Sequence, residues 1–529
     1  MYHPPDQGND QEVRAIINAV RAREHCTPHD VDRILRRYRR PGQPPLSRTR
    51  LVAAYRRLCA QGVWPLERET LRRLQRKPVR TLSGVAPVTV LTKPFPCPGR
   101  CIFCPDREGM PKSYLPDEPG ALRAAAHDFD PYAQTASRIE AFEAIGHSTD
   151  KVELLILGGT WSVYPHDYQE WFIRRCLEAM NGVESASLLD AQQRNETAAH
   201  RNVGLVIETR PDTITSEEVR RLRWLGVTKV QMGIQSLDDA ILARNRRGHT
   251  VEQTRQAVRL LRLAGFKIVL HWMPNLLGAT PEADLADFRR LWDDPALRPD
   301  ELKIYPCLLL PGTELHTLWQ QGLYRPYPEE TLIDLLVRCK AIIPPYCRVN
   351  RLMRDFPAPN IVEGCTSSNL RQIVQRRMQE QGLACQCVRC REVRGAEVDP
   401  DTLRLDTLTY ATDVSEEHFL SAVTPAGRLA GFLRLSLPRR QVELPIEEIR
   451  GCAVIREVHV YGPALEIAAP SEGEAQHLGL GSRLIEEAKR ISQQRGFHRL
   501  AVIAAVGTRE YYRQRGFELG ELYMLTPLQ

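Results

Sequence analysis

The sequence predicts an α/β protein whose centre is a partial, open (β/α)6 barrel, with a helical module before it and a smaller α+β domain after it. Three observations predict this fold. The 529 residues are 43% hydrophobic, which is enough for several domain cores. Short apolar segments alternate with helical stretches from about residue 80 onward. A second series of strand-like segments follows residue 400, after a linker rich in proline and cysteine.

Residues 1–75 are predicted to form a basic helical module. Apolar residues recur at helical spacing over 11–24, 30–40 and 47–61, and Thr27 and Asp30 suit the cap of the second helix. Residues 1–80 hold 18 Arg and Lys against 8 Asp and Glu, while the rest of the chain is slightly acidic. This asymmetry favours a polyanionic partner, although a solvated helical surface would carry the same charge. The arginines on polar faces or helix ends are Arg36, Arg37, Arg39, Arg40, Arg56 and Arg57.

Residues 76–354 carry the repeated βα units. Apolar segments that suit buried parallel strands lie at 87–92, 153–158, 204–208, 229–234, 267–272 and 302–306. Helical patterns lie between them, at 167–180, 216–225, 251–265 and 282–293. Six units are too few for a closed eight-stranded barrel, so we expect a partial one.

The segment CPGRCIFC places Cys97, Cys101 and Cys104 directly after the first strand, at the barrel edge where active sites of βα barrels form. Three thiolates leave one iron of a [4Fe–4S] cluster without a protein ligand. That iron can bind the amino and carboxylate groups of S-adenosylmethionine (SAM), whose cleavage gives a 5′-deoxyadenosyl radical. The alternatives are a zinc site that lacks its fourth ligand and a chance spacing.

A second triplet, Cys385, Cys387 and Cys390, lies in the linker of residues 355–400. Structural zinc takes four nitrogen or sulfur ligands, and Cys365 is our candidate for the fourth. Cys347 or a distant histidine would serve as well, and the cysteines could also be unligated. The other cysteines of the 14 in the chain suit small buried side chains in a reducing compartment.

Residues 401–529 predict a separate α+β domain, with strands at 403–411, 429–436, 453–460 and 499–504 and a helix at 480–495. Gln476, Gly479 and Gly481 form a glycine turn that opens this helix. Backbone N–H groups at such a turn suit a pyrophosphate, although a plain turn would look the same.

These motifs resemble two known folds. The cysteine motif is similar to that of the radical-SAM superfamily, which implies that Gly158, Gly159 and Thr160 bind the methionine end of SAM. The strand ends at Glu208, Arg210 and Gln235, with His271 beyond them, then complete the cofactor site. The Gln-x-x-Gly-x-Gly turn resembles the coenzyme A loop of GNAT acetyltransferases. That likeness places His459 and Val460 beside the pantetheine arm and Tyr511 and Tyr512 near the thioester, with core packing as the alternative for the tyrosines.

The combination resembles the catalytic subunit family of Elongator in its stand-alone prokaryotic form, over roughly residues 75–529. Blocks such as KIYPCLLLPGTEL and GTREYYRQRGFEL carry this likeness. It implies 5-carboxymethylation of uridine 34 in the tRNA anticodon stem-loop. The methyl group of acetyl-CoA would be activated by the 5′-deoxyadenosyl radical and added to C5. Lys303 and Tyr305 would lie where substrate meets radical, and Lys93 would join the basic module on RNA phosphates.

Two other functions fit parts of the sequence. The C-terminal domain alone would suit a protein or histone lysine acetyltransferase, but such an enzyme has no use for three cluster cysteines. A non-catalytic RNA-binding protein with structural metals is the other alternative.

No apolar run reaches the ~18 residues that span a bilayer, and no signal peptide is evident, so we expect a cytoplasmic protein without membrane contact. Whether it forms a homodimer is left open.

Overall fold

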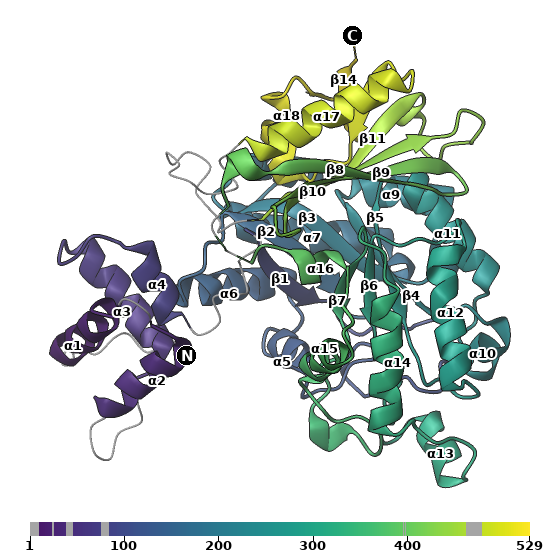
Figure 1. The fold of residues 1–529 in the computed structure, drawn as a ribbon, viewed down its shortest axis with the longest axis horizontal. Helices are drawn as coiled ribbons and strands as arrows, with labels where there is room; N and C mark the ends of the chain where they lie inside the picture. Colours follow the sequence, from purple (N-terminus) through teal and green to yellow (C-terminus); the bar gives the residue numbers. More distant parts are fainter. Residues whose placement is uncertain are drawn as a thin grey trace.

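The computed structural model describes residues 10–23, 26–38, 46–75, 84–394, 396, 398–461 and 479–528. It has three parts (Figure 1): a small helical module at the N-terminus, a central α/β body, and a β-rich domain that covers one end of this body. The predicted residues Arg39, Arg40 and Gln476 lie outside the described residues. In the described part of the chain, no helix is both long and apolar enough to span a membrane.

The N-terminal module has four helices around its own core. They are α1 (Asp10–Arg21), α2 (Pro28–Arg37), α3 (Arg48–Ala60) and α4 (Arg68–Leu74). The predicted cap of α2 is confirmed, because the Thr27 hydroxyl accepts from the Asp30 amide at 3.2 Å and the Asp30 carboxylate accepts from the Thr27 amide at 3.0 Å. Three helices were expected. The fourth has only seven residues, too short for a clear periodic pattern.

The module is held against α6 (Pro131–Ala144) of the body, which points toward it in Figure 1. Arg56 Nη1 donates to the carbonyl oxygen of Glu143 at 2.9 Å, and Gln75 Nε2 donates to that of Gly146 at 2.6 Å. Arg56, which we expected to contact phosphate, therefore also fixes the position of the module.

The body is a seven-stranded parallel sheet in the order β1-β2-β3-β4-β5-β6-β7. Its strands are β1 (Ala86–Leu91), β2 (Lys151–Leu157), β3 (Arg201–Thr209), β4 (Lys229–Gln235), β5 (Lys267–Trp272), β6 (Glu301–Ile304) and β7 (Arg348–Arg351). The six predicted strands are confirmed. We missed β7 because it has four residues, of which only Val349 is buried and apolar. β1 and β7 remain the two edges of the sheet, so the barrel is open as expected.

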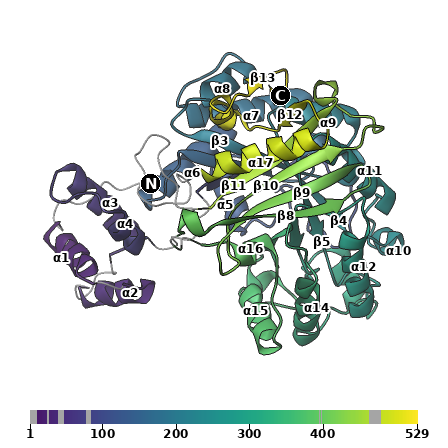
Figure 2. The same cartoon turned by 45° about the horizontal axis from the view of Figure 1, so that its top comes forward.

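Helices cover the outer face of the sheet (Figures 1 and 2). Besides α6, the helices of the body are α5 (Pro119–Ala125), α7 (His166–Asn181), α8 (Leu188–Asn195), α9 (Ser216–Trp224), α10 (Asp239–Arg244), α11 (Val251–Leu263), α12 (Pro281–Asp293), α13 (Glu314–Gln320) and α14 (Glu329–Ala341), of which α5 lines the cavity inside the barrel instead. The core between sheet and helices is apolar and includes Leu154, Ile207, Met232, Leu261 and Phe288. Burial of these side chains stabilises the packing of each helix on the sheet, and this packing is the arrangement that the alternating βα pattern of the sequence predicts.

The linker contains α15 (Leu370–Glu380) and the short helix α16 (Val388–Arg391). Short 3-10 turns lie at η3 (Trp161–Val163), η4 (Pro211–Thr213), η5 (Ala358–Asn360), η6 (Pro400–Thr402), η7 (Glu447–Ile449) and η8 (Val506–Thr508). The turns η3 and η4 follow β2 and β3 directly, at the edge that carries the cysteine motif.

The C-terminal domain is a second seven-stranded sheet in the order β13-β14-β12-β11-β10-β9-β8. Its strands are β8 (Arg404–Ala411), β9 (Ser415–Val423), β10 (Leu429–Pro438), β11 (Cys452–Val460), β12 (Arg499–Val502), β13 (Glu518–Leu519) and β14 (Met524–Pro527). The helix α17 (Leu480–Gln494) lies on this sheet in Figure 2, and α18 (Arg509–Arg513) follows β12. The sequence predicted four of these strands and missed β9, β13 and β14, of which β13 has only two residues.

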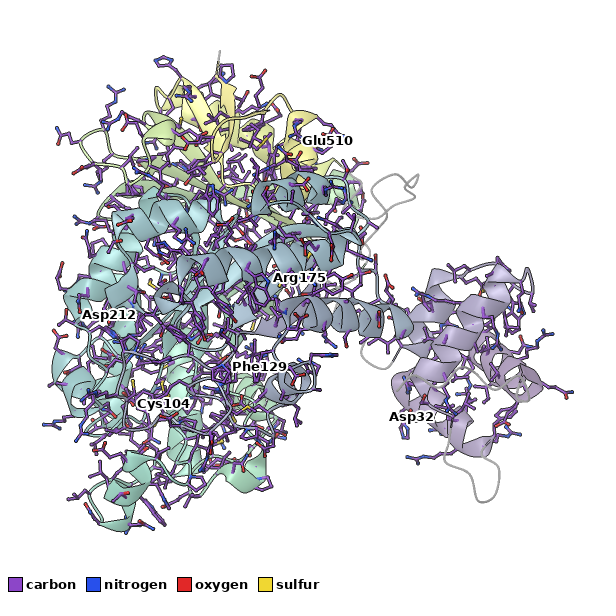
Figure 3. The ribbon with its side chains drawn as sticks, turned by 180° about the vertical axis from the view of Figure 1, so that it is seen from behind. Asp32, Cys104, Phe129, Arg175, Asp212 and Glu510 are labelled. Atoms are coloured by element: carbon purple, nitrogen blue, oxygen red, sulfur yellow. The ribbon has the colours of Figure 1, made fainter. Side chains whose placement is uncertain are left out.

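The two sheets meet at the N-terminal edge of the barrel strands. Tyr523 donates to the carbonyl oxygen of Ala264, just before β5, and Gly507 lies against Asn202 at the start of β3. The cysteine motif lies at the opposite, C-terminal edge. Figure 3 shows Cys104 in the body and Glu510 in the C-terminal domain above it.

Candidate functional site

The cysteine motif follows β1 and is held in place by backbone hydrogen bonds on two sides. The Ile102 amide donates to the Asn245 carbonyl at 3.3 Å, and the Leu315 amide donates to the Ile102 carbonyl at 2.9 Å. Cys97 Sγ lies 3.6 Å from Thr160 Oγ1, and Arg247 Nη1 donates to Cys101 Sγ at 3.4 Å. Thr160 follows β2, and Arg247 also donates to the carbonyl oxygen of Gly233 in β4. The cysteine motif therefore lies beside the ends of β2 and β4, where the sequence analysis placed the cofactor residues.

The pair of glycines after β2 explains how Thr160 reaches Cys97. Gly158 and Gly159 have φ values of 118° and 129°, a backbone conformation that side chains strongly disfavour. A Cβ atom on Gly158 would also lie 2.4 Å from Thr92 Oγ1. This tight turn brings the chain from β2 directly to the cysteine motif.

Burial changes the protonation of one thiol of the motif, that of Cys104. Burial and the neighbouring Cys101 raise the pKa of the Cys104 thiol to about 12. A thiol with this pKa stays protonated at neutral pH, whereas a metal ligand must be a thiolate. A bound cationic group would supply the missing stabilisation.

Buried polar atoms without a partner mark the space beside the motif. Arg210 Nη1, Gln235 Oε1 and both ring nitrogens of His249 have no hydrogen-bond partner among the described residues. Leaving such groups unpaired costs about 1–3 kcal/mol each, so a polar ligand is expected to bind them. The sequence predicted Arg210 and Gln235 for the cofactor. It missed His249 because a lone histidine between helices carries no pattern of its own.

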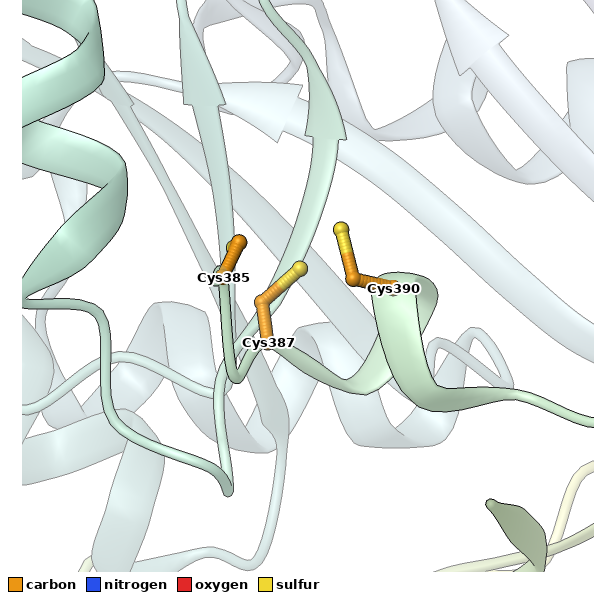
Figure 4. A group of neighbouring side chains, drawn as sticks. All are labelled: Cys385, Cys387 and Cys390. Carbon is orange, nitrogen blue, oxygen red and sulfur yellow. The ribbon is translucent and has the colours of Figure 1, made fainter. Parts of the chain in front are cut away.

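The two cysteine triplets differ in geometry. Cys385, Cys387 and Cys390 place their sulfur atoms within 4.8 Å of one another (Figure 4), which no other group of three cysteine, histidine or acidic ligand atoms does among the described residues. Sulfur ligands of one tetrahedral zinc ion lie about 3.8 Å apart, given Zn–S bonds of about 2.3 Å. In a cubane cluster each thiolate binds a different iron, so a wider triangle suits Cys97, Cys101 and Cys104.

Cys365 does not join the second triplet, contrary to our expectation. Its thiol lies beside Glu329. The helix α15, about 16 Å long at 1.5 Å per residue, separates it from Cys385 along the chain. The backbone of Cys347 contacts the triplet instead, because its carbonyl accepts from the Val388 amide at 2.9 Å.

Two side chains point at the second triplet from neighbouring helices. Lys340 Nζ donates to Cys390 Sγ at 3.8 Å, and Gln375 Nε2 donates to the same sulfur at 3.7 Å. Lys340 is fully buried, so its charge is available to balance a group of thiolates. The donor set fits a single thiophilic ion such as zinc.

A single cavity of about 1770 Å³ joins the barrel to the C-terminal domain. On the barrel side, its wall includes Glu208, Lys303 and Tyr305. Lys303 Nζ lies 5.8 Å from the centre of the Tyr305 ring, and His271 Nδ1 lies 3.8 Å from a Glu208 oxygen. Burial and the charge of Lys303 lower the pKa of His271 well below its usual range, so His271 is neutral here.

On the other side, the cavity wall includes His459, Val460, Gly479, Gly481, Tyr511 and Tyr512. β11 pairs in parallel with β12 only as far as Ile455 and Val502, where β12 ends, so the rest of β11 up to Val460 extends beyond this neighbouring strand. Gly479, with φ of 66°, precedes α17, and a Cβ on Gly481 would lie 2.3 Å from the Tyr511 hydroxyl. Tyr512 is largely buried and its ring packs against Phe517, so the alternative role of core packing applies to Tyr512 more than to Tyr511.

Basic side chains outnumber acidic ones fifteen to eight in the cavity wall. The sequence missed this region, because residues after 80 are slightly acidic overall and only the fold gathers their basic side chains. Several of these arginines are also paired, such as Arg354 with Glu118 and Arg348 with Glu392. The wall therefore offers a polyanion both charge and a fixed surface.

Comparison with known proteins agrees with this geometry. The chain matches the Radical SAM superfamily over residues 96–289 and the Radical_SAM C-terminal domain over residues 299–380. It is 42% identical to the tRNA uridine(34) acetyltransferase of Methanocaldococcus jannaschii, covering 85% of this chain and 86% of that protein. It is 36% identical to Elongator complex protein 3 of Homo sapiens, covering 86% of each. The chain belongs to the Elongator complex protein 3 family.

A solved structure of this family agrees with the fold. The chain superposes on archaeal Elp3 of Methanocaldococcus infernus, truncated at its N-terminus, with a TM-score of 0.74 and 38% identity over 84% of this chain and 99% of that chain. As a member of the Elongator complex protein 3 family, the chain is a radical SAM enzyme. Membership implies a [4Fe–4S] cluster and SAM, and Cys97, Cys101 and Cys104 with the unpaired polar atoms beside them fit both groups.

Five of the seven predicted nucleic-acid residues lie in the described part of the chain. Arg36 and Arg37 are exposed on α2, and Lys93 is exposed above the Tyr168 ring, 4.8 Å from its centre. Arg56 and Arg57 are half-buried, and Arg56 binds the body. The exposed side chains thus remain the best candidates for phosphate contacts.

Proposed function

We propose that this chain converts uridine 34 of tRNA to its 5-carboxymethyl derivative, with acetyl-CoA as the source of the new carbons. The relatives named tRNA uridine(34) acetyltransferase support uridine 34 of tRNA as the substrate. The observation that supports the reaction itself is the cavity. It connects the barrel end of Glu208 and Tyr305 to the glycine turn and Tyr511 of the C-terminal domain. Two reactants held by different domains can meet inside it.

In this proposal Cys97, Cys101 and Cys104 hold the cluster, and the segment Gly158–Thr160 with Arg210 and Gln235 holds SAM. When bound, the pair would supply a 5′-deoxyadenosyl radical that could take a hydrogen atom from the methyl group of acetyl-CoA. The carbon radical would add to C5 of the uridine, and loss of one electron and one proton followed by hydrolysis of the thioester would release CoA and leave the carboxymethyl group. The unpaired atoms Arg210 Nη1 and Gln235 Oε1 fix the cofactor. Lys303 and Tyr305 orient the acceptor in the cavity wall.

Acetyl-CoA binding is proposed for the C-terminal domain, as a GNAT-like fold. β11 extends beyond the end of β12, which leaves room for the pantetheine arm beside His459 and Val460. The amides that begin α17 after Gly479 suit the pyrophosphate, because helix N-termini favour anions. Tyr511 would then orient the thioester from the far side of Gly481.

The tRNA would use both basic regions. The cavity is larger than the roughly 300–1,000 Å³ of ordinary small-ligand pockets, and its wall is rich in Arg and Lys. RNA-binding proteins splay single-stranded loop bases into such pockets, and the anticodon loop offers them. Arg36, Arg37 and Lys93 would bind phosphates outside the cavity.

Zinc is proposed for Cys385, Cys387 and Cys390. The triplet lies between α15 and the C-terminal domain, and Arg428 Nη1 donates to the Cys390 carbonyl at 3.0 Å. A metal here would fix the linker that joins the two halves of the cavity wall.

The test is nucleoside mass spectrometry of tRNA after anaerobic reaction with SAM and acetyl-CoA. The native chain should form 5-carboxymethyluridine and release 5′-deoxyadenosine. Cys101→Ala should abolish both while leaving tRNA binding largely intact. Modified tRNA from this variant, or acetyl transfer to lysine without SAM, would contradict the proposal.

A further inference from the structure

Arg247 lies directly behind the cysteine motif and is not one of the residues that the sequence motifs singled out. It is only 8% exposed and follows α10 in a short loop. Its Nη1 donates to Cys101 Sγ at 3.4 Å, and its Nε donates to the Gly233 carbonyl at 3.2 Å. One planar guanidinium thus joins the end of β4 to a cluster ligand.

Several contacts fix Arg247 in this position. Its amide donates to the Leu242 carbonyl at 2.9 Å, and Arg210 Nη2 donates to the Arg247 carbonyl at 2.9 Å. Gly233 leaves space for the guanidinium, because a Cβ there would lie 2.8 Å from Arg247 Nη2. A side chain held this firmly can impose its geometry on Cys101.

The charge of Arg247 has no carboxylate to balance it. Arg210 pairs with both oxygens of Asp212 at 2.9 Å, whereas Arg247 has no ion-pair partner in the part of the chain that the structure describes. Arginine remains charged in proteins, and a buried unpaired charge is costly. The atom that faces this charge is the Cys101 sulfur, so the missing anion is a thiolate ligand of the cluster.

We infer that Arg247 is a positioning residue that holds the Cys101 thiolate and makes the bound cluster easier to reduce. Hydrogen bonds to ligand sulfur atoms and the local net charge set the reduction potential of iron–sulfur clusters. Reduction adds one negative charge, which a buried cation a few ångströms away stabilises with little screening by salt. The inference rests on membership of the radical SAM superfamily and is independent of the proposed tRNA chemistry.

The test compares Arg247→Gln and Arg247→Lys with the native chain after anaerobic reconstitution of the cluster. A redox titration with dithionite, followed by the EPR signal of the reduced cluster, needs no SAM, tRNA or acetyl-CoA. For Arg247→Gln we expect at least a tenfold lower ratio of reduced to oxidised cluster at a fixed potential, about 59 mV for one electron. Arg247→Lys keeps the charge but cannot bridge Gly233 and Cys101 with one planar group, so its shift should be smaller but measurable.

Arg246→Gln is the matched control, because Arg246 is exposed and pairs with Glu314 at 2.8 Å. Its potential should equal that of the native chain. An unchanged potential in Arg247→Gln with full iron content would overturn the inference. So would an unchanged potential combined with weaker SAM binding, which would assign Arg247 to the cofactor. If Arg247→Gln retains too little iron for titration, a native potential in Arg247→Lys overturns it instead.

Discussion

Arg456 of the C-terminal domain and Asp300 of the barrel form a fully buried ion pair across the boundary between the two sheets. Arg456 Nη1 donates to Asp300 Oδ2 at 2.8 Å, and Arg434 Nη1 lies 3.5 Å from Asp300 Oδ1. Asp300 Oδ2 also accepts from the Ile268 amide at 2.9 Å, at the start of β5. The pair therefore ties the barrel strands to the domain that completes the cavity.

Asp300→Asn should destabilise the chain by about 3–5 kcal/mol, because it leaves the buried charge of Arg456 without its main partner. Chemical denaturation followed by circular dichroism measures this loss. Asp406→Asn is the control: Asp406 pairs with Arg404 on the exposed strand β8, and its loss should cost less than about 1 kcal/mol. If both variants lose the same free energy of unfolding, the buried pair of Asp300 and Arg456 stabilises the chain no more than an exposed ion pair does.

The free energy of unfolding of the metal-free chain should fall as the pH drops below 6.5. Burial and the nearby charges of Arg247 and Arg210 lower the pKa of His249 from 6.5 to about 3. The unfolded chain takes up the proton first, so the contribution of neutral His249 is complete above pH 6.5 and is lost as the pH falls toward 3. His271 acts in the same direction.

Thermal unfolding between about pH 7.5 and 5 measures this dependence. His249→Asn removes one of the titrating groups and should give a shallower slope than the native chain. An identical slope in the variant would contradict the role of His249.

Gly158→Ala should weaken SAM binding at least tenfold and destabilise the chain by more than about 2 kcal/mol. Its φ of 118° disfavours a side chain, and the added Cβ would collide with Thr92. Gly182→Ala separates the two effects, because Gly182 has a φ of 69° but no atom within 4 Å of the added Cβ. That variant should lose only about 1–2 kcal/mol and bind SAM normally, as equilibrium dialysis would show.

Arg37→Gln should weaken tRNA binding and reduce its dependence on salt. Arg37 is exposed in the last turn of α2, and each lost phosphate contact lowers the slope of log K against log[salt] by about 0.7–0.9. Filter binding at several salt concentrations measures both quantities. Arg376→Gln on α15 is the control, because Arg376 is also exposed but lies outside the module and the cavity wall. If Arg37→Gln keeps the native slope of log K against log[salt], Arg37 does not contact the RNA.

Cys390→Ser should remove bound zinc, which elemental analysis of the purified chain detects. Its sulfur is one of the three that lie within 4.8 Å of one another and accepts from Lys340 and Gln375. Cys365→Ser, outside the triplet, should retain the metal. Loss of zinc from Cys365→Ser but not from Cys390→Ser would reverse the assignment.

The sequence by itself determined the features that repeat along the chain. Apolar segments alternating with helices predicted six of the seven barrel strands, and the cysteine spacing after β1 predicted the edge that carries the cluster. These succeed because strand burial and ligand spacing are local properties of a few neighbouring residues. β7 was not predicted, because only Val349 of its four residues is buried and apolar, which leaves no local pattern to recognise.

Only the tertiary structure decided what comes together from distant segments. It brought Arg247 to Cys101, although 146 positions separate them, and left Cys365 away from the triplet. It gathered basic side chains from both domains into one cavity wall, which a net charge summed along the chain conceals. The physical reason is that such contacts depend on how buried sheets and helices pack, and that packing is set by the whole core rather than by any single motif.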